Sequence, residues 1–253
     1  MVKNILITGA SSGLGAALAV VYAKENVNLF LCARNSEKLK EVAAICQSKK
    51  AQVFTKIFDV KDCLKSQEII NEIEENYVID LIIANAGISA GTASGFESFA
   101  QVKEIFATNL DGVLNIIHPA ISKMVARKSG QIAIISSLAG FRGLPSSPAY
   151  SASKSAVRVY AESLRGNLAQ FGIKVNAVCP GYIKTPMTDV NDFYMPFLMK
   201  SDKAAKIIKK SLERNKSRIA FPFPLYFVVW LATLISTKIT DPIFSCLPKK
   251  KAI

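Results

Sequence analysis

Apolar and polar positions along this chain follow two alternating patterns. Short apolar runs of strand length are each followed by a longer segment in which apolar residues recur every three or four positions, as on one face of a helix. The runs that predict strands are residues 3–8, 27–32, 53–58, 79–84, 131–135 and 174–178. Repeated strand and helix units predict an α/β fold, a doubly wound parallel sheet of about seven strands with helices on both faces.

Helical spacing predicts helices over residues 16–23, 37–46, 64–76, 96–127, 150–171 and 201–212. The 96–127 helix is unusually long, and it carries Thr108 and Asn109 in its middle and Pro119 in its later part. In a parallel sheet of this kind, the carboxyl ends of the strands meet at one edge, where ligands bind. Asp59 and the run Asn85-Ala86-Gly87 are expected at that edge.

A glycine-rich turn joins the first predicted strand to the first predicted helix. Gly9, Gly13 and Gly15 have the spacing Gly-x-x-x-Gly-x-Gly, with Ser11, Ser12 and Leu14 between them. Glycines allow a tight turn and let backbone N–H groups approach a pyrophosphate at the helix N-terminus, where the helix dipole favours anions. The turn therefore indicates a dinucleotide site, although the spacing differs from the usual fingerprint and a plain turn stays open as the alternative.

The end of the second predicted strand bears on the choice of cofactor. A dinucleotide site selective for NAD has an acidic residue near this point, but the chain has Ala33-Arg34-Asn35. The planar guanidinium of Arg34 suits a 2′-phosphate, so NADP(H) is the expected cofactor and NAD(H) remains the alternative. Arg34 could instead cap the strand and stack on adenine in either cofactor.

Tyr150 and Lys154 lie four residues apart, on one face of a predicted helix. A free tyrosine titrates near pH 10, and a nearby cation favours the phenolate and lowers that pKa, so the pair can handle protons. The motif is common by chance, and its weight comes from the other motifs. His118 is the only histidine, so no histidine metal cluster is expected and we interpret it as structural.

Composition adds limits on partners. The net charge of +13 arises from 32 Lys and Arg against 19 Asp and Glu, and it favours anionic partners such as phosphate groups or acidic lipids. Nucleic acid is disfavoured because the basic residues are scattered and not interleaved with stacking aromatic residues. The five cysteines have no paired spacing and are interpreted as buried thiols in a reducing compartment, and a strand begins directly at the N-terminus, so a cytoplasmic protein is expected.

With these motifs in order, residues 2–187 resemble the classical short-chain dehydrogenase/reductase family. The resemblance implies a single-domain Rossmann fold over residues 1–253 in which Tyr150 is the general acid or base, Ser137 orients the substrate oxygen, Lys154 lowers the pKa of Tyr150 and Asn109 supports a proton relay. It implies a homodimer or homotetramer. The residues expected at the cofactor are Gly9, Ser11, Ser12, Gly13, Leu14, Gly15, Arg34, Asn35, Asp59, Val60, Asn85, Ala86, Gly87, Tyr150, Lys154, Pro180, Gly181, Ile183 and Thr185.

The C-terminal part departs from the family pattern. Residues 188–217 are expected to form a substrate lid and a basic helix, and residues 218–253 an apolar and basic extension similar to the tail of membrane-associated steroid and lipid reductases. The apolar run 219–235 is short and broken by prolines, but basic residues flank it. Packing within the domain or a dimer, attachment to the inner face of a membrane, and a membrane span all stay open.

The function predicted from the sequence is NADPH-dependent reduction of a ketone or aldehyde, or the reverse oxidation, on a small apolar or lipid-like molecule. A membrane-associated dinucleotide sensor or scaffold without turnover is the alternative.

Overall fold

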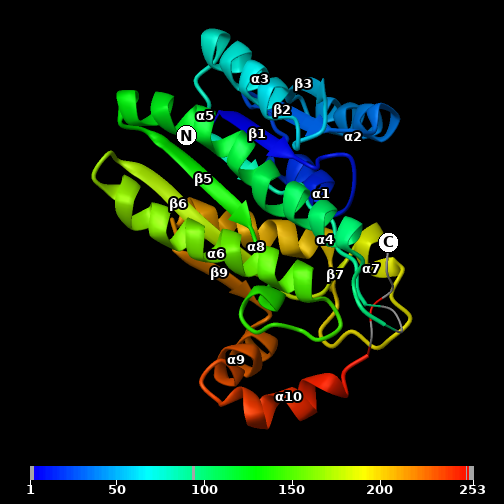
Figure 1. Cartoon of the computed structure of the whole chain (residues 1–253). Coiled ribbons are helices and arrows are strands. Elements are labelled where there is room, and N and C mark those ends of the chain that lie inside the picture. Colours follow the sequence, from blue (N-terminus) through cyan, green and yellow to red (C-terminus); the bar gives the residue numbers. More distant parts are fainter. Residues whose placement is uncertain (1–2, 93–94, 249, 251–253) are drawn as a thin grey trace.

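Within the residues that the computed structural model describes, 3–92, 95–248 and 250, seven parallel strands form the main sheet (Figure 1). Their order across the sheet is β3 (Gln52–Ile57), β2 (Asn28–Ala33), β1 (Asn4–Thr8), β4 (Leu81–Ala84), β5 (Gly130–Ile135), β6 (Ile173–Pro180) and β9 (Arg218–Phe221). The order runs outward in both directions from the neighbouring strands β1 and β4, as in a doubly wound sheet. The predicted fold class is confirmed.

Helices cover both faces of this sheet because the strands are apolar on both sides. Ile5 and Ile7 belong to a buried cluster with α1 (Gly13–Tyr22), α2 (Ser36–Ser48) and α8 (Ser201–Glu213). Leu6 points to the opposite face, where the cluster includes α3 (Cys63–Asn76), α5 (Gly112–Arg127) and α6 (Pro148–Ala169). Successive side chains of a strand alternate between faces, so a continuous apolar run can serve two helical layers.

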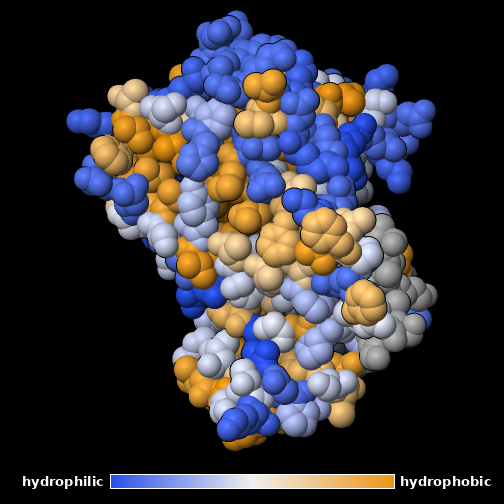
Figure 2. All heavy atoms as spheres, viewed as in Figure 1, coloured by the Kyte–Doolittle hydropathy of each residue, from blue (hydrophilic) through white to orange (hydrophobic). Residues whose placement is uncertain are grey.

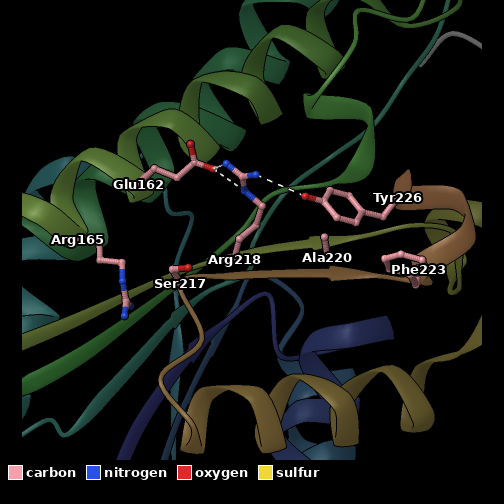
Figure 3. Close-up of a pocket in the computed structure, with 7 residues that line it drawn as sticks. All are labelled: Glu162, Arg165, Ser217, Arg218, Ala220, Phe223 and Tyr226. Atoms are coloured by element: carbon pink, nitrogen blue, oxygen red, sulfur yellow. Dashed lines mark hydrogen bonds and ion pairs between the residues drawn. The ribbon is translucent and has the colours of Figure 1, made fainter. Parts of the chain in front are cut away.

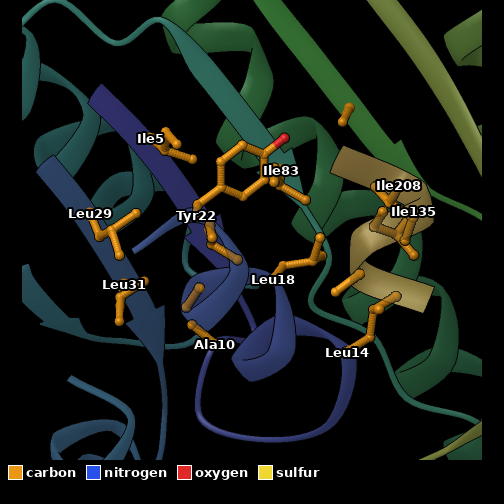
Figure 4. Close-up of a cluster of buried hydrophobic side chains, with 14 of the residues drawn as sticks. Ile5, Ala10, Leu14, Leu18, Tyr22, Leu29, Leu31, Ile83, Ile135 and Ile208 are labelled. Atoms are coloured by element: carbon orange, nitrogen blue, oxygen red, sulfur yellow. The ribbon is translucent and has the colours of Figure 1, made fainter. Parts of the chain in front are cut away.

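The first helix is fixed by its apolar face (Figure 4). Leu14, Leu18 and Tyr22 lie on the buried side of α1, against side chains of the sheet and Ile208 of α8. Burying a side chain the size of leucine contributes about 1.5–3 kcal/mol. This packing holds the N-terminus of α1 at the carboxyl end of β1, where the glycine-rich turn lies.

The long helix predicted over 96–127 is wrong in its middle. The structure has α4 (Phe99–Phe106), a π-helical segment (Ala107–Asp111) and then α5. The Gly112 N–H donates to the carbonyl of Ala107, five residues back, whereas an N–H of a regular α-helix donates four residues back. The buried Asn109 side chain lies in this segment and is bound to the loop after β4, which accounts for the local change in winding.

The segment predicted as an extension begins with the seventh strand. Ile219 and Phe221 of β9 are buried, and β9 pairs with β6 from Ala177↔Arg218 to Pro180↔Phe221. The sheet therefore includes the first four residues of the predicted extension, Arg218–Phe221. Two helices follow, α9 (Phe223–Ala232) and α10 (Thr237–Ser245), and lie beside the end of the sheet in Figure 1.

Among the described residues no helix has both the length and the apolar character that crossing a membrane requires. The predicted lid region contains two short strands that pair in parallel, β7 (Ile183–Lys184) and β8 (Met199–Lys200), with α7 (Pro186–Asp189) between them. Cys63 and Cys246 are exposed, so the prediction that all five cysteines are buried is wrong. Cys63 is the first residue of α3 and Cys246 follows the end of α10, and at both positions the residue is exposed to solvent.

Candidate active site

The glycine-rich turn passes close under the end of β4. Gly9 and Gly13 have φ angles of +65° and +55°, which favour glycine. A Cβ atom at Gly15 would lie 2.2 Å from the carbonyl oxygen of Gly9 and 2.6 Å from Asn85 Nδ2, so no side chain fits there. Ser11 and Ser12 lie between these glycines, and Ser12 precedes α1 without a side-chain capping bond. The first N–H groups of α1 are thus left for a ligand.

Asn85 and its neighbours join β4 to this turn. The Asn85 side-chain amide donates to the carbonyl of Thr8 at 2.9 Å, and the Thr8 hydroxyl accepts from the backbone N–H groups of Asn85 and Ala86 at 3.0 Å each. A Cβ atom at Gly87 would lie 3.1 Å from Asn109 Oδ1 and 3.3 Å from Lys154 Nζ. The predicted run 85–87 therefore connects the glycine-rich turn with Asn109 and Lys154.

The predicted adenosine end lies at the carboxyl ends of β2 and β3. Arg34 is largely exposed, and its guanidinium forms an ion pair with Asp59 at 3.4 Å. Lys61 Nζ lies 3.6 Å from the same carboxylate, which sets two cations around one anion. Val60 is buried beneath α5. Asn35 caps α2 by accepting from the Lys38 N–H, so its observed contact is structural.

Asn109 is fully buried and uses both ends of its amide. Oδ1 accepts from the Ile88 N–H at 2.8 Å, while Nδ2 donates to the Ile88 carbonyl at 2.9 Å and to Ser153 Oγ at 3.0 Å. Ser153 in turn donates to the carbonyl of Tyr150 at 2.8 Å. Asn109 thus links the loop after β4 to the helix that carries Tyr150.

Ser153 did not figure in the sequence prediction. Its signal was a small polar residue three positions after Tyr150, on the buried side of the same helix.

Tyr150 and Lys154 lie on α6, and Ser137 lies at the end of β5. Lys154 Nζ donates to the carbonyl of Ile135 at 2.9 Å and is 5.9 Å from the centroid of the Tyr150 ring. Ser137 Oγ donates to the carbonyl of Pro180 at 3.5 Å and accepts from the Ala139 N–H. The structure therefore brings together the four predicted catalytic residues, Asn109, Ser137, Tyr150 and Lys154.

Burial sets the charge state of the tyrosine and the lysine. It raises the pKa of Tyr150 above its ordinary value, and a hydrogen bond with Ser137 opposes this only in part. Burial lowers the pKa of Lys154 to about 8. The expected lowering of the Tyr150 pKa is therefore not met in net direction, because burial of the phenol dominates.

The segment after β6 returns to the glycine-rich turn. A Cβ atom at Gly13 would lie 3.0 Å from Thr185 Cγ2, so Thr185 packs against the turn. Ile183 is buried, and the Thr188 hydroxyl donates to its carbonyl at 2.7 Å. The Gly181 N–H donates to the Phe221 carbonyl at 2.8 Å, which ties this segment to β9. Pro180, Gly181, Ile183 and Thr185 thus line the side of the edge opposite Asn85.

The family model for short chain dehydrogenases matches residues 3–192. The chain belongs to the short-chain dehydrogenase family. It is therefore an oxidoreductase of that family, and the predicted resemblance is confirmed over most of the domain.

Two curated relatives and one solved structure show how far this similarity extends. An uncharacterized oxidoreductase of Myxococcus xanthus is 34% identical over 240 residues, covering 94% of this chain and 95% of the relative. The 3-oxoacyl-acyl-carrier-protein reductase FabG of Rickettsia prowazekii is 34% identical over 187 residues, 74% of this chain and 75% of the relative. The crystal structure of an actinorhodin polyketide ketoreductase variant with NADPH has a TM-score of 0.80 at 25% identity, covering 88% of this chain and 97% of that one.

A pocket of about 460 Å³ lies elsewhere on this short-chain dehydrogenase, beside β9 (Figure 3). Arg218 pairs with Glu162 at 2.7 Å and reaches the Tyr226 hydroxyl at 3.5 Å. None of the residues that line this pocket belongs to the predicted site, so it is separate from the catalytic residues. Among the described residues, no group of three or more histidine, cysteine or acidic side chains could hold a metal ion.

Proposed function

We propose that this protein catalyses the NADPH-dependent reduction of a ketone or aldehyde on an apolar or lipid-like molecule, or the reverse oxidation. The observation that carries the proposal is the grouping of Tyr150, Ser137, Lys154 and Asn109 at the carboxyl edge of the sheet. Asn109 and Ser153 connect to the backbone of Tyr150, and Lys154 lies beside its ring. The family supplies the reaction class, and the arrangement of this chain's residues supports the roles.

The residues present fit a dinucleotide. The tight turn that Gly9, Gly13 and Gly15 permit, and the N-terminus of α1 without a side-chain cap, suit a pyrophosphate. Lys154 uses one donor on Ile135, which leaves two for ribose hydroxyls. Arg34 is exposed and retains donors for a 2′-phosphate, and the ketoreductase cited above binds NADPH. When bound, the cofactor supplies or accepts the hydride.

The protein's own part is to move a proton at the Tyr150 hydroxyl. Because burial raises the pKa of Tyr150, the phenol stays protonated near neutral pH and can donate to a developing alkoxide. Ser137 hydrogen-bonds the phenol, and it can hold the substrate oxygen at the same point. After the transfer, Lys154 stabilises the phenolate as a nearby cation, and the network through Ser153 and Asn109 keeps the tyrosine in place. The protonated tyrosine is the form that begins the reduction, and the phenolate is the form that begins the reverse oxidation.

Replacing Tyr150 by Phe tests the mechanism. We expect the variant to lose turnover by at least about a hundredfold, the scale of general acid catalysis, while NADPH binding measured by fluorescence changes little. Tyr160→Phe is the matched control, because Tyr160 lies on the same helix but bonds His118. A Tyr150→Phe protein with full activity would exclude this mechanism. Tight NADPH binding by the natural protein without turnover on a broad carbonyl panel would favour the sensor alternative.

We propose residues 190–198 as the lid over the apolar part of the substrate. The segment is anchored at both sides by the pairing of β7 with β8, and Tyr194, Phe197 and Leu198 are exposed between the anchors. Exposed aromatic side chains on an anchored loop suit closure over an apolar ligand. The basic helix α8, by contrast, packs its apolar side on α1 and supports the fold.

We also propose that α9 and α10 lie on an anionic membrane surface. Apolar side chains are exposed over both helices (Figure 2), and Ile239, Ile243 and Leu247 follow one another at helical spacing. Lys238 is exposed beside them, and the chain carries a net charge of +13. An apolar face with a basic border suits attachment to acidic lipid.

Flotation with vesicles tests this attachment. We expect the protein to float with vesicles containing phosphatidylglycerol and less with neutral vesicles. Leu234→Ser should weaken flotation, whereas Leu64→Ser, at a leucine on α3 that is even more exposed, should not. No flotation together with a Leu234-dependent dimer or tetramer in light scattering would assign this face to oligomer contact.

A further inference from the structure

After α10, residues 246–248 lead away from α9 and α10 toward the rest of the domain (Figure 1), and Lys250 lies beside the catalytic residues. Lys250 Nζ donates to Ser89 Oγ at 2.7 Å and lies 5.8 Å from the centroid of the Tyr150 ring. Lys154 Nζ lies 5.9 Å from the same centroid. Two lysine ammonium groups therefore approach one catalytic ring, from segments that are far apart in the sequence.

The backbone of Lys250 packs against two loops, the one that contains Gly91 and the one that contains Ser146. A Cβ atom at Gly91 would lie 2.4 Å from both Cβ and the carbonyl oxygen of Lys250, and 2.6 Å from the Ser146 carbonyl. The Thr92 N–H donates to that same Ser146 carbonyl at 3.0 Å, which joins the two loops. Gly91 thus leaves the space that the lysine backbone occupies. Ser146, shortly before the helix α6 that carries Tyr150, and Gly91, in the loop after β4, therefore both lie against the Lys250 backbone.

The charge of Lys250 has no acidic partner among the described residues. None of their ion pairs includes Lys250, and its hydrogen bond goes to a neutral hydroxyl. Burial lowers the pKa of Lys250 to about 8, as expected for an ammonium group that lacks a counter-ion. A buried cation without a partner is costly, and an anion placed beside it removes that cost.

Building on the proposed function, we propose that Lys250 binds an anionic group of the substrate, a carboxylate or a phosphate, close to the carbonyl that Tyr150 protonates. The substrate is then an amphiphilic oxo compound with its oxyanion at the Lys250 and Ser89 end and its apolar part under the 190–198 lid. Ser89 orients the ammonium group, and Gly91 admits the backbone that carries it.

The test compares charged and neutral forms of one substrate. A series of oxo acids of increasing spacing is assayed beside the methyl esters, and an oxoalkyl phosphate beside its alcohol. The natural protein should prefer the anion. Lys250→Gln should lower kcat/KM for the anion by about 10- to 100-fold, the worth of a charge-assisted hydrogen bond, chiefly through KM, with the ester changed by less than about twofold. Lys250→Arg should retain part of the preference, and Lys238→Gln all of it.

Equilibrium binding gives a second readout. Calorimetric titration of the hydroxy acid product should show the same loss of affinity in Lys250→Gln, even if no carbonyl compound is turned over. Ester turnover by the natural protein, on the other hand, tests the proposed function by itself. An anion-to-ester ratio that stays the same in Lys250→Gln would overturn the proposal. A rise in turnover of both forms would also overturn it, because the tail would then be obstructing the site.

Discussion

Because Lys154 is buried as a charged group, the free energy of unfolding of this enzyme should rise with pH between about 8 and 10.5. Its side chain is 4% exposed, and burial lowers its pKa from 10.5 to about 8. Since a tenfold change in protonation equals about 1.4 kcal/mol, the charged form costs about 3 kcal/mol near pH 7. Between the folded pKa of about 8 and the unfolded pKa of 10.5, the unfolded chain binds more protons than the folded chain, so stability increases as the pH rises through this range.

Lys154→Met removes this titration while keeping the length of the side chain. The lysine penalty falls from about 3 kcal/mol near pH 7 to about 1 kcal/mol near pH 9.5. The stability of the natural protein relative to Lys154→Met should therefore rise by about 2 kcal/mol between those conditions. The variant also leaves the Ile135 carbonyl without its donor, a loss of about 1 kcal/mol that does not depend on pH.

Urea unfolding of both proteins at the two pH values measures the difference. Alkaline effects on the rest of the chain cancel, and Lys238→Met, an exposed lysine on α10, should show no such slope. A flat difference for Lys154→Met would show that the ammonium group is well solvated. A difference of opposite sign would show that Lys154 gains a negatively charged partner on folding.

Three further predictions concern the neighbouring residues. Asn109→Ala should lower the free energy of unfolding by about 2–4 kcal/mol in urea titrations, because the backbone groups of Ile88 lose their partners; a loss below about 0.5 kcal/mol would contradict the network. Gly15→Val should abolish NADPH binding in fluorescence titrations, because a Cβ atom lies 2.2 Å from the Gly9 carbonyl, and normal affinity would mean that the turn adjusts freely. Arg34→Asp should shift the ratio of kcat/KM values from NADPH toward NADH, and an unchanged ratio would remove Arg34 as the selective residue.

The strands were predictable from the sequence because parallel strands buried on both faces read as continuous apolar runs. The run at 131–135 corresponds to β5, Gly130–Ile135, and the run at 27–32 to β2, Asn28–Ala33. β9 was not distinguished, because its four residues lie within a longer apolar segment that continues into α9. Hydrophobic periodicity cannot divide such a segment into a strand and a helix.

The candidate site was predictable where short motifs carry it, and not where distant contacts do. Tyr150 and Lys154 were selected by their spacing, and Ser137 by the resemblance to the family. Lys250 was not, because a lysine in a basic run is normally a surface residue, and its contacts with Tyr150 and Ser89 span 100 and 161 residues. The direction of the Tyr150 pKa also escaped prediction, since it depends on burial by the folded chain.

The position of Asn109 depends on the number of residues in the π-helical segment Ala107–Asp111. A π-helical turn holds one residue more than an α-helical turn, so deleting one residue here would restore a regular helix while α4 and α5 keep nearly the same faces. The regular helix would be locally more stable, yet Asn109 would shift relative to the loop after β4 and lose its hydrogen bonds to Ile88. A scan of substitutions would not find this constraint, whereas a single deletion would.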